Sequence, residues 1–401
     1  MGELVVMVAS LMALNALAID VMLPALGGIA EDFAVTHAND QQLVVIAYIL
    51  GFGFPQLAWG PLSDRFGRRP MVFVALLGYS IAGCVAAFMP SFELLLGVRF
   101  VQGVFAAGCR VVAVAVVRDR FVGSAMAKVM SLVMTVFMVV PITAPMLGQG
   151  LLLVASWEAI FYVLAAVGTA VLLWTGLRLR ESLPVAQRRP LKLRAIAKTY
   201  REVLKTRVTL GYMLASGILF AALFSFLSAS EQIFREVFDE GERFVFWFAG
   251  IAIVLSATNF ANSRLVRRYG MRRLSHGALI GFTVLSAVLL LAIDALGEHL
   301  WLFFPLFSAI FALFGLIGAN FNSLAMEPLG KVAGTASAAY GFATTTVSGS
   351  IGGLIGRAYD GTTRPLLLGY VALGVVCLLI VLITERGRLF QADRSAEATA
   401  S

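Results

Sequence analysis

The chain has 401 residues, of which 60% are hydrophobic and only 13% are charged. A soluble protein of this size carries about 25% charged residues, so the composition excludes a typical soluble protein and indicates a surface that faces lipid. The net charge of +8 raises the question of nucleic-acid binding, which the positions of the basic residues decide. The three cysteines and three histidines are scattered, so they predict neither a disulfide framework nor a metal site.

A helix that crosses a bilayer needs about 20 predominantly apolar residues, and the sequence contains twelve such runs. We expect an all-α membrane protein in which each run forms a transmembrane helix. In chain order the expected spans are 4–27, 41–60, 70–89, 92–117, 127–152, 157–178, 208–231, 244–264, 274–294, 299–325, 333–356 and 364–385. Glycine and proline punctuate the basic stretch 60–70, so this stretch is expected to be a turn between two spans.

Basic residues test this topology, because loops rich in Lys and Arg stay on the cytoplasmic side of a membrane. With both termini in the cytoplasm, 25 of the 31 Lys and Arg residues lie in inner loops or the C-terminal tail, and four lie in outer loops. The alternation predicts a multi-pass protein of a bacterial-type inner membrane with both ends cytoplasmic. It also accounts for the net charge without nucleic acid.

The longest inner connection divides the chain into two sets of six helices. It predicts an N-terminal bundle over 1–178, a cytoplasmic linker over 179–207 and a C-terminal bundle over 208–401. Residues 191–204 are expected to form an amphipathic helix on the anionic inner leaflet.

An internal repeat supports the two halves. An offset of 203 residues aligns Gly67 with Gly270 and preserves the basic turn, but Arg267 replaces Asp64. Parallel repeats that hold substrate near the bilayer midplane are a known transporter design. Because the second copy has lost the acid, any contact based on Asp64 is expected in the first half only.

Several short motifs resemble those of the major facilitator superfamily. Residues 60–70 are similar to its Gly-x-Leu-x-Asp-Arg-x-Gly-Arg-Arg signature, and 99–103 to its Arg-x-x-Gln-Gly signature. Residues 20–24 and 141–149 resemble motifs of its drug–proton antiporters, although Ala144 and Gln149 replace glycines. Residues 327–338 resemble the Bcr/CflA multidrug-resistance branch. The resemblance covers about residues 10–385 and implies twelve helices in two pseudo-symmetric six-helix bundles.

Asp20 is the only charged residue between Glu3 and Glu31. A carboxyl group deep in a membrane helix is a functional candidate, because it is able to load and release the proton that coupling requires. The alternative is a structural carboxylate that caps the helix beside Pro24 or stays paired with an arginine. We expect Arg99 to bond the first helix and respond to Asp20, or else to form a structural tie.

Arg99 and Arg110 are eleven residues apart and therefore share one helix face. Arg110 is either a fixed charge for an anionic or carbonyl-bearing substrate or a structural tie. The candidates for the substrate cavity are polar residues inside apolar runs: Asn15, Tyr48, Gln56, Gln102, Arg110, Asn259, Asn320 and Asn322. With Phe220, Phe224, Phe226, Phe311 and Phe314 they suggest a large apolar pocket suited to drug-like solutes. Glu231 is either a second acidic site or, as we expect, an exposed loop carboxylate.

By resemblance, the 60–70 turn belongs to a cytoplasmic latch that holds one conformational state. Its expected members are Gly60, Asp64, Arg65, Gly67, Arg68, Arg69 and Asp119, with Asp119 as the partner of Arg65. Breaking such a pair shifts a conformational equilibrium; the alternative is a solvated cluster that sets topology. In the fifth span, Pro141, Pro145 and Gly148 are expected to kink the helix and permit close packing, unless they are ordinary irregularities.

These patterns predict a proton-coupled antiporter that exports small amphipathic, drug-like molecules by alternating access. We expect it to use no cofactor or metal, because the proton gradient drives it. Its expected partners are a small-molecule substrate, protons and the lipid bilayer, and it is expected to act as a monomer. No nucleophile motif or metal-ligand spacing indicates an enzyme. The alternative is a metabolite exporter or a proton-coupled uptake symporter of the same fold, which the departures at Ala144 and Gln149 leave open.

Overall fold

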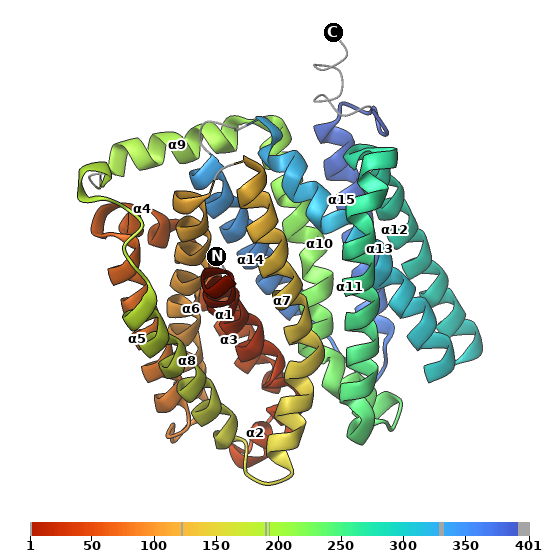
Figure 1. The fold of residues 1–401 in the computed structure, drawn as a ribbon. Helices are drawn as coiled ribbons and strands as arrows, with labels where there is room; N and C mark the ends of the chain where they lie inside the picture. The colour runs from red at the N-terminus through yellow and green to blue at the C-terminus, as the bar shows by residue number, and fades with distance from the viewer. Residues whose placement is uncertain (1, 122, 189–190, 192, 329–332, 392–401) are drawn as a thin grey trace. The chain divides into compact units, whose positions relative to one another are not determined.

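The computed structural model describes residues 2–391, except 122, 189–190, 192 and 329–332. In this part of the chain the secondary structure consists of helices and turns, without strands (Figure 1). Up to residue 205 the helices are α1 Gly2–Asp20, α2 Leu26–Asp32, α3 Leu43–Gly53, α4 Gln56–Phe66, α5 Arg68–Ala86, α6 Phe92–Arg120, α7 Gly123–Leu152, α8 Glu158–Arg178 and α9 Leu193–Lys205. The remaining helices are α10 Arg207–Gln232, α11 Phe244–Tyr269, α12 Met271–Leu296, α13 Leu300–Met326, α14 Ala333–Arg357 and α15 Arg364–Thr384.

Short segments join some of these helices. They are the 3-10 segments η1 Leu23–Ala25, η2 Ala38–Gln42, η3 Val185–Gln187 and η5 Gly241–Arg243, and the π-helical turn η4 Ile233–Val237. Among the described residues, nine helical segments are long and apolar enough to cross a membrane, and the bent α3–α4 pair makes a tenth. The long helices α7 and α14 match the fifth and eleventh expected spans. The expected all-α membrane fold is confirmed.

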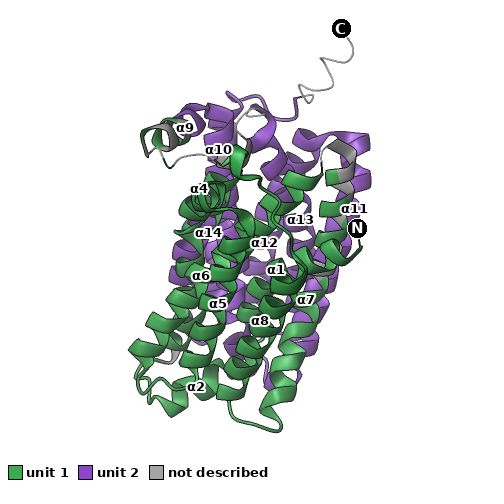
Figure 2. Cartoon of the chain, turned by 60° about the vertical axis from the view of Figure 1, so that its left-hand side comes forward, with its two compact units in different colours: residues 1–200, 337–346 green, residues 201–336, 347–401 purple. Residues whose placement is uncertain are grey.

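The chain forms two compact units (Figure 2). Unit 1 contains Met1–Tyr200 and Ser337–Thr346, and unit 2 contains Arg201–Ala336 and Val347–Ser401. The boundary between the units falls within α9, inside the expected linker. The helix expected in that linker is confirmed as α9, whereas its contact with a membrane stays a prediction.

The same helix pairings occur inside each unit. In unit 1, α6 packs against α1, α3 and α5, and α8 packs against α1 and α5; in unit 2, α13 packs against α10, α11 and α12, and α15 packs against α10 and α12. Small residues permit the closest approaches. For example, Gly51 of α3 faces the carbonyl of Phe100, and Gly103 of α6 faces the carbonyl of Tyr48.

Residues 4–27 do not form one continuous helix. α1 ends at Asp20, η1 contains Pro24, and α2 then continues to Asp32. In a continuous helix the N–H of residue 24 would bond the carbonyl of Asp20, and proline has no N–H. The break therefore leaves Asp20 as the last residue of the first helix.

The expectation of a turn over 60–70 is wrong in its extent. α4 continues through Pro61 to Phe66, and only Gly67 separates it from α5. Pro61 cannot bond the carbonyl of Leu57, and the hydroxyl of Tyr200 donates to that carbonyl instead, at 3.1 Å. Gly67 has a φ of 101°, and its repeat Gly270 has a φ of 80°, which only glycine adopts readily.

We predict opposite effects of alanine at two glycines of this segment. Gly67→Ala should destabilise the protein by about 1–2 kcal/mol, because φ is positive there and the new methyl group would meet Glu181 and Arg188. Gly60→Ala is the matched control, since no atom lies within 4 Å of its new methyl group and alanine favours a helix by about 0.5–1 kcal/mol. Thermal denaturation of the purified protein in detergent measures both. Equal losses would contradict a helix at Gly60.

Candidate functional site

Asp20, at the C-terminal end of α1, is only 4% exposed. Within the part of the chain that the structure describes, its carboxyl group has neither a hydrogen bond nor an ion pair. The α1 segment lies in a run long and apolar enough to cross a membrane. An acid in such a setting is normally paired or functional.

Arg99, on α6, is fully buried and bonds three groups. Its Nη1 donates to Gln102 Oε1 at 2.7 Å. Its Nη2 donates to the carbonyl of Ala18 at 2.9 Å, and its Nε to that of Val44 at 3.3 Å. Arg99 thus bonds the first helix, as expected, but through a backbone carbonyl rather than the Asp20 carboxyl group. These bonds tie α6 to α1 and α3.

The α7 helix comes very close to the chain beside Asp20. Pro141 and Pro145 lie inside this helix, and Gly148 faces the carbonyl of Val21 with no room for a side chain. Two roles were expected for these three residues, to kink the helix and to permit close packing. The contact at Gly148 agrees with close packing.

Three candidate cavity residues carry a buried polar atom without a hydrogen-bond partner among the described residues. These atoms are Asn15 Oδ1, Tyr48 Oη and Gln102 Nε2. Tyr48 and Gln102 also contact Arg99, whose guanidinium carbon lies 4.5 Å from the centre of the Tyr48 ring. Because buried polar atoms nearly always have partners in folded proteins, these atoms are candidates for contact with a bound molecule.

Other candidate cavity residues occupy different surroundings. In unit 1, Gln56 donates to Phe52 and Thr345, both at 3.2 Å. Arg110 is half-buried, and its guanidinium carbon lies 5.7 Å from the centre of the Phe52 ring.

Unit 2 contains the remaining candidates. Asn320 donates to Asn262 Oδ1 at 2.9 Å, whereas Asn259 is half-buried and Asn322 is exposed. These three residues belong to unit 2, whereas Asp20 belongs to unit 1.

The structure also bears on two further expectations about unit 2, which concern the phenylalanines of the expected apolar pocket and Glu231. Phe226 and Phe311 are buried and pack with their ring centroids 5.2 Å apart, inside an aromatic core. The description of Glu231 as an exposed loop carboxylate is wrong. It lies in α10, is 8% exposed and pairs with Arg235 at 2.8 Å.

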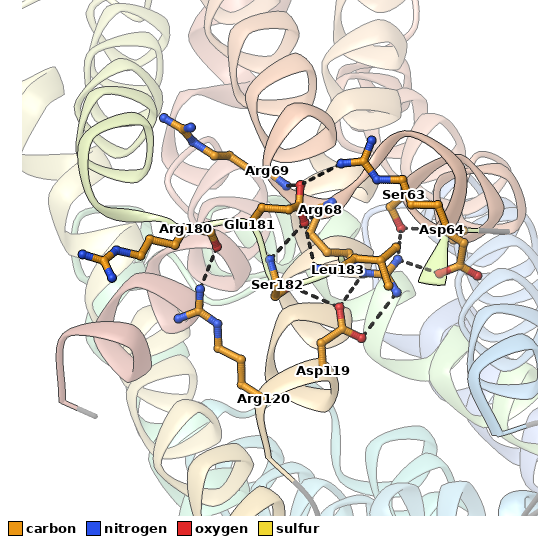
Figure 3. Close-up of polar contacts among 12 residues, drawn as sticks. Ser63, Asp64, Arg68, Arg69, Asp119, Arg120, Arg180, Glu181, Ser182 and Leu183 are labelled. Atoms are coloured by element: carbon orange, nitrogen blue, oxygen red, sulfur yellow. Dashed lines mark hydrogen bonds and ion pairs between the residues drawn. The ribbon is translucent and has the colours of Figure 1, made fainter. Parts of the chain in front are cut away.

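A charged cluster joins the ends of α4, α5, α6 and α8, and Arg68 lies at its centre (Figure 3). Arg68 Nε donates to Asp119 Oδ2 at 2.8 Å, and Nη1 pairs with Asp64 Oδ1 at 2.7 Å. Ser63 accepts a further bond from Nη1 at 2.6 Å. The expected pairing of Asp119 with Arg65 is wrong, because the rigid guanidinium fork of Arg68 holds this carboxylate instead.

Glu181 completes this cluster at the N-terminus of α5. Its carboxylate accepts the backbone N–H groups of Arg68, at 2.9 Å, and Arg69, at 3.2 Å. The first N–H groups of a helix have no partners within the helix, so a carboxylate there is favoured by hydrogen bonding and by the helix dipole. The carbonyl of Gly60 accepts a bond from the Ser63 hydroxyl at 2.9 Å, and Gly67 forms the turn that starts α5. Among the described residues, Arg65 has neither a hydrogen bond nor an ion pair with this group.

Unit 2 contains a second cluster of the same kind. Arg272, near the start of α12, pairs with Glu327 at 2.8 Å and with Glu385 at 3.0 Å. Tyr212 also donates to Glu385, at 2.7 Å. Burial would raise the pKa of Glu385, but the bonds from Tyr212 and Arg272 lower it below its ordinary value. A contact based on an aspartate at the Asp64 position is thus found in the first half, as expected, whereas in unit 2 two glutamates from other helix ends pair with Arg272.

Glu181 and Glu385 were not among the residues expected at a functional site, and Glu327 was noted only as part of the 327–338 motif. A sequence signal for Glu181 and Glu385 exists, since Arg272 and Glu385 follow Arg68 and Glu181 by the same 204 residues. The offset of 203 that aligns the glycines conceals this relation.

Comparisons with known proteins identify the family and agree with the fold. The model of the Major Facilitator Superfamily matches residues 8–353. A bicyclomycin resistance protein homolog from Haemophilus influenzae is 29% identical over 365 residues, which cover 90% of each chain. The multidrug resistance protein MdtL from Klebsiella pneumoniae is 26% identical over 388 residues, or 94% of each chain. The solved nucleoside transporter NupG has a TM-score of 0.72 at 15% identity, and the match covers 95% of this chain and 99% of NupG; this likeness concerns the fold alone.

We predict that Gly148→Ala pushes α7 away from the segment that follows Asp20. The added methyl group would collide with the carbonyl of Val21, and overpacking of this kind costs about 1–3 kcal/mol. Gly150→Ala, on the same helix, has open space and is the matched control. The melting temperature in detergent should fall for Gly148→Ala only. A normal melting temperature for this variant would show that the two segments do not pack as described.

We also predict that Glu385→Gln destabilises unit 2 by about 3 kcal/mol, because it leaves a buried arginine less fully paired. Glu327→Gln should cost less, since the Glu327 side chain is 19% exposed and that of Glu385 only 3%. Chemical denaturation of the purified protein in detergent measures both losses.

The effect of Glu385→Gln should depend on pH. A lowered pKa means that Glu385 stabilises the fold above its ordinary value of 4.5 and loses this effect as the pH falls through its value in the fold. The stability difference from the unmutated protein should therefore be constant from neutral pH to about pH 5 and shrink below that. A difference that persists unchanged in stronger acid would contradict the role of the charge.

Proposed function

The chain belongs to the Major Facilitator Superfamily, a family of transporters rather than enzymes, and we propose that this multi-pass inner-membrane protein exports small amphipathic, drug-like molecules in exchange for protons. Both termini lie in the cytoplasm in this proposal, as the distribution of basic residues predicts. The observation that carries the exchange mechanism is the buried Asp20 carboxyl group, which has no hydrogen-bond or ion-pair partner among the residues that the structure describes.

An ionised carboxylate buried without a partner costs several kcal/mol. Arg99 does not offset this cost at Asp20, because its Nε, Nη1 and Nη2 groups bond Val44, Gln102 and Ala18. Loss of the proton from Asp20 therefore requires a change in its surroundings, such as access to water or an approaching cationic or polar substrate. In this way proton transfer at Asp20 is linked to substrate binding and to the conformational change.

The polar atoms of Asn15, Tyr48 and Gln102 that lack partners support an amphipathic substrate. A few polar groups within apolar surroundings orient a ligand, while apolar contacts bind most of its surface. The relatives named for bicyclomycin resistance and multidrug resistance support the same substrate class.

Transport further requires the two halves to move as bodies around the substrate. The clusters at Arg68 and Arg272 each connect several helix ends within one unit. We assign them the role of keeping each bundle intact during this motion, and the Arg68 cluster remains our candidate for the conformational latch.

We predict that Asp20→Asn abolishes transport driven by a pH gradient, because the amide, unlike the carboxyl group, does not take up and release a proton. With bicyclomycin as the probe and purified protein in proteoliposomes, the rate of gradient-driven transport should be lower in the variant than in the unmutated protein by at least about tenfold. Glu31→Gln is the control, since it removes an exposed acid from the neighbouring helix α2. Unchanged transport by Asp20→Asn would refute the coupling role of this residue.

Reversal of the pH gradient distinguishes export from uptake. The proposed antiporter moves bicyclomycin against the direction of proton flow, whereas an uptake symporter of the same fold moves it with the protons. Movement of substrate and protons in the same direction would favour the alternative that the departures at Ala144 and Gln149 leave open.

A further inference from the structure

Unit 2 contains a cavity of about 470 Å³ just beyond the ends of two helices. Its lining residues come from the first residues of α10 and from the segment after α15, and they are Arg207, Val208, Glu385, Arg386, Arg388 and Gln391. Both helices belong to segments long and apolar enough to cross a membrane. The cavity therefore lies at the level where a bilayer presents its head groups.

The cavity carries uncompensated positive charge. Arg207, Arg386 and Arg388 form no ion pair with any acid among the described residues. The acid in the wall, Glu385, is already engaged by Arg272 and Tyr212. Three arginines line one space, and guanidinium groups are donors suited to the oxygens of a phosphate group.

Backbone groups add to this charge at the start of α10. The hydroxyl of Thr206, which precedes the helix, donates to the carbonyl of Glu202 at 3.0 Å and caps none of the first N–H groups. The cavity is lined by Arg207 and Val208, the first two residues of α10. The start of a helix favours an anion because its N–H groups and dipole present positive charge.

The wall formed by the C-terminal segment is fixed in place. The backbone N–H of Phe390 donates to His276 Nδ1 at 3.2 Å, and Arg273 Nε donates to the carbonyl of Phe390 at 3.3 Å. The N–H of Gly387 bonds the carbonyl of Leu382 at 2.8 Å. These bonds fold the chain back against unit 2 and hold Arg386 and Arg388 at the cavity.

The sequence just before Arg207 is also basic on one side. Arg194, Lys198, Arg201 and Lys205 are spaced as neighbours on one face of α9, and all four are exposed. Such a face is attracted to an anionic membrane surface. Arg201 and Lys205, which belong to unit 2 with the cavity, would bring anionic head groups to the segment that leads into Arg207.

We propose that this cavity binds a phosphate-bearing anion, either the head group of an anionic lipid or a free phosphate. The three arginines contact the phosphate oxygens, and the start of α10 contributes backbone donors. This site differs from the proposed transport site in unit 1, and its occupancy is independent of Asp20.

The test uses the purified full chain in a non-ionic detergent, with the melting temperature as the readout. Dioctanoyl phosphatidylglycerol, zwitterionic dioctanoyl phosphatidylcholine and sodium phosphate are titrated separately. Phosphatidylglycerol should raise the melting temperature and phosphatidylcholine should not. A response to phosphatidylglycerol alone identifies a lipid head group, and a response to sodium phosphate as well identifies a site open to free phosphate.

The double substitution Arg386→Gln/Arg388→Gln should weaken the phosphatidylglycerol response by about tenfold or more, since each basic contact contributes about 1 kcal/mol. Arg264→Gln/Arg267→Gln is the matched control, because it removes two positive charges from the end of α11, outside the cavity. If the first variant is unstable, Arg207→Gln provides the same test from the other wall. An unchanged response in the cavity variants, equal loss in the control or equal binding of phosphatidylcholine would overturn the proposal.

Discussion

Charged groups inside an apolar helical bundle need partners within that bundle, because the surrounding lipid supplies none. Arg99 meets this requirement with Gln102 and two backbone carbonyls. Arg68 and Arg272 meet it with acids at neighbouring helix ends. Asp20 is buried without such a partner among the described residues, and the proposed transport mechanism depends on this exception.

Both units satisfy the requirement in the same way. In each, an arginine at the start of one helix binds acids at or just beyond the ends of two other helices, although the residues of the two clusters are not strictly aligned. The two units thus share the arrangement of charges more fully than they share the sequence of the basic turn. This is the behaviour expected when lipid constrains where charges lie more strongly than which residue carries them.

Much of the fold is predictable from the sequence, because length and hydropathy define membrane helices and the basic loops define their order. The helix across Gly60 and Pro61 is not, because its missing bond is replaced by Tyr200, a residue distant in sequence. The partner of Asp119 is equally hidden, since three nearby arginines differ only in the direction that the fold gives them. Asp20 was identifiable because a single charge interrupts a long apolar run, whereas its lack of a partner required the structure.

Proton release on substrate binding tests the central claim most directly. Purified protein in weakly buffered detergent, with a pH-sensitive dye, would be mixed with a compound that it exports. We expect the unmutated protein to release protons and Asp20→Asn to bind the compound without releasing any. Equal proton release by both proteins would contradict the assignment of coupling to Asp20.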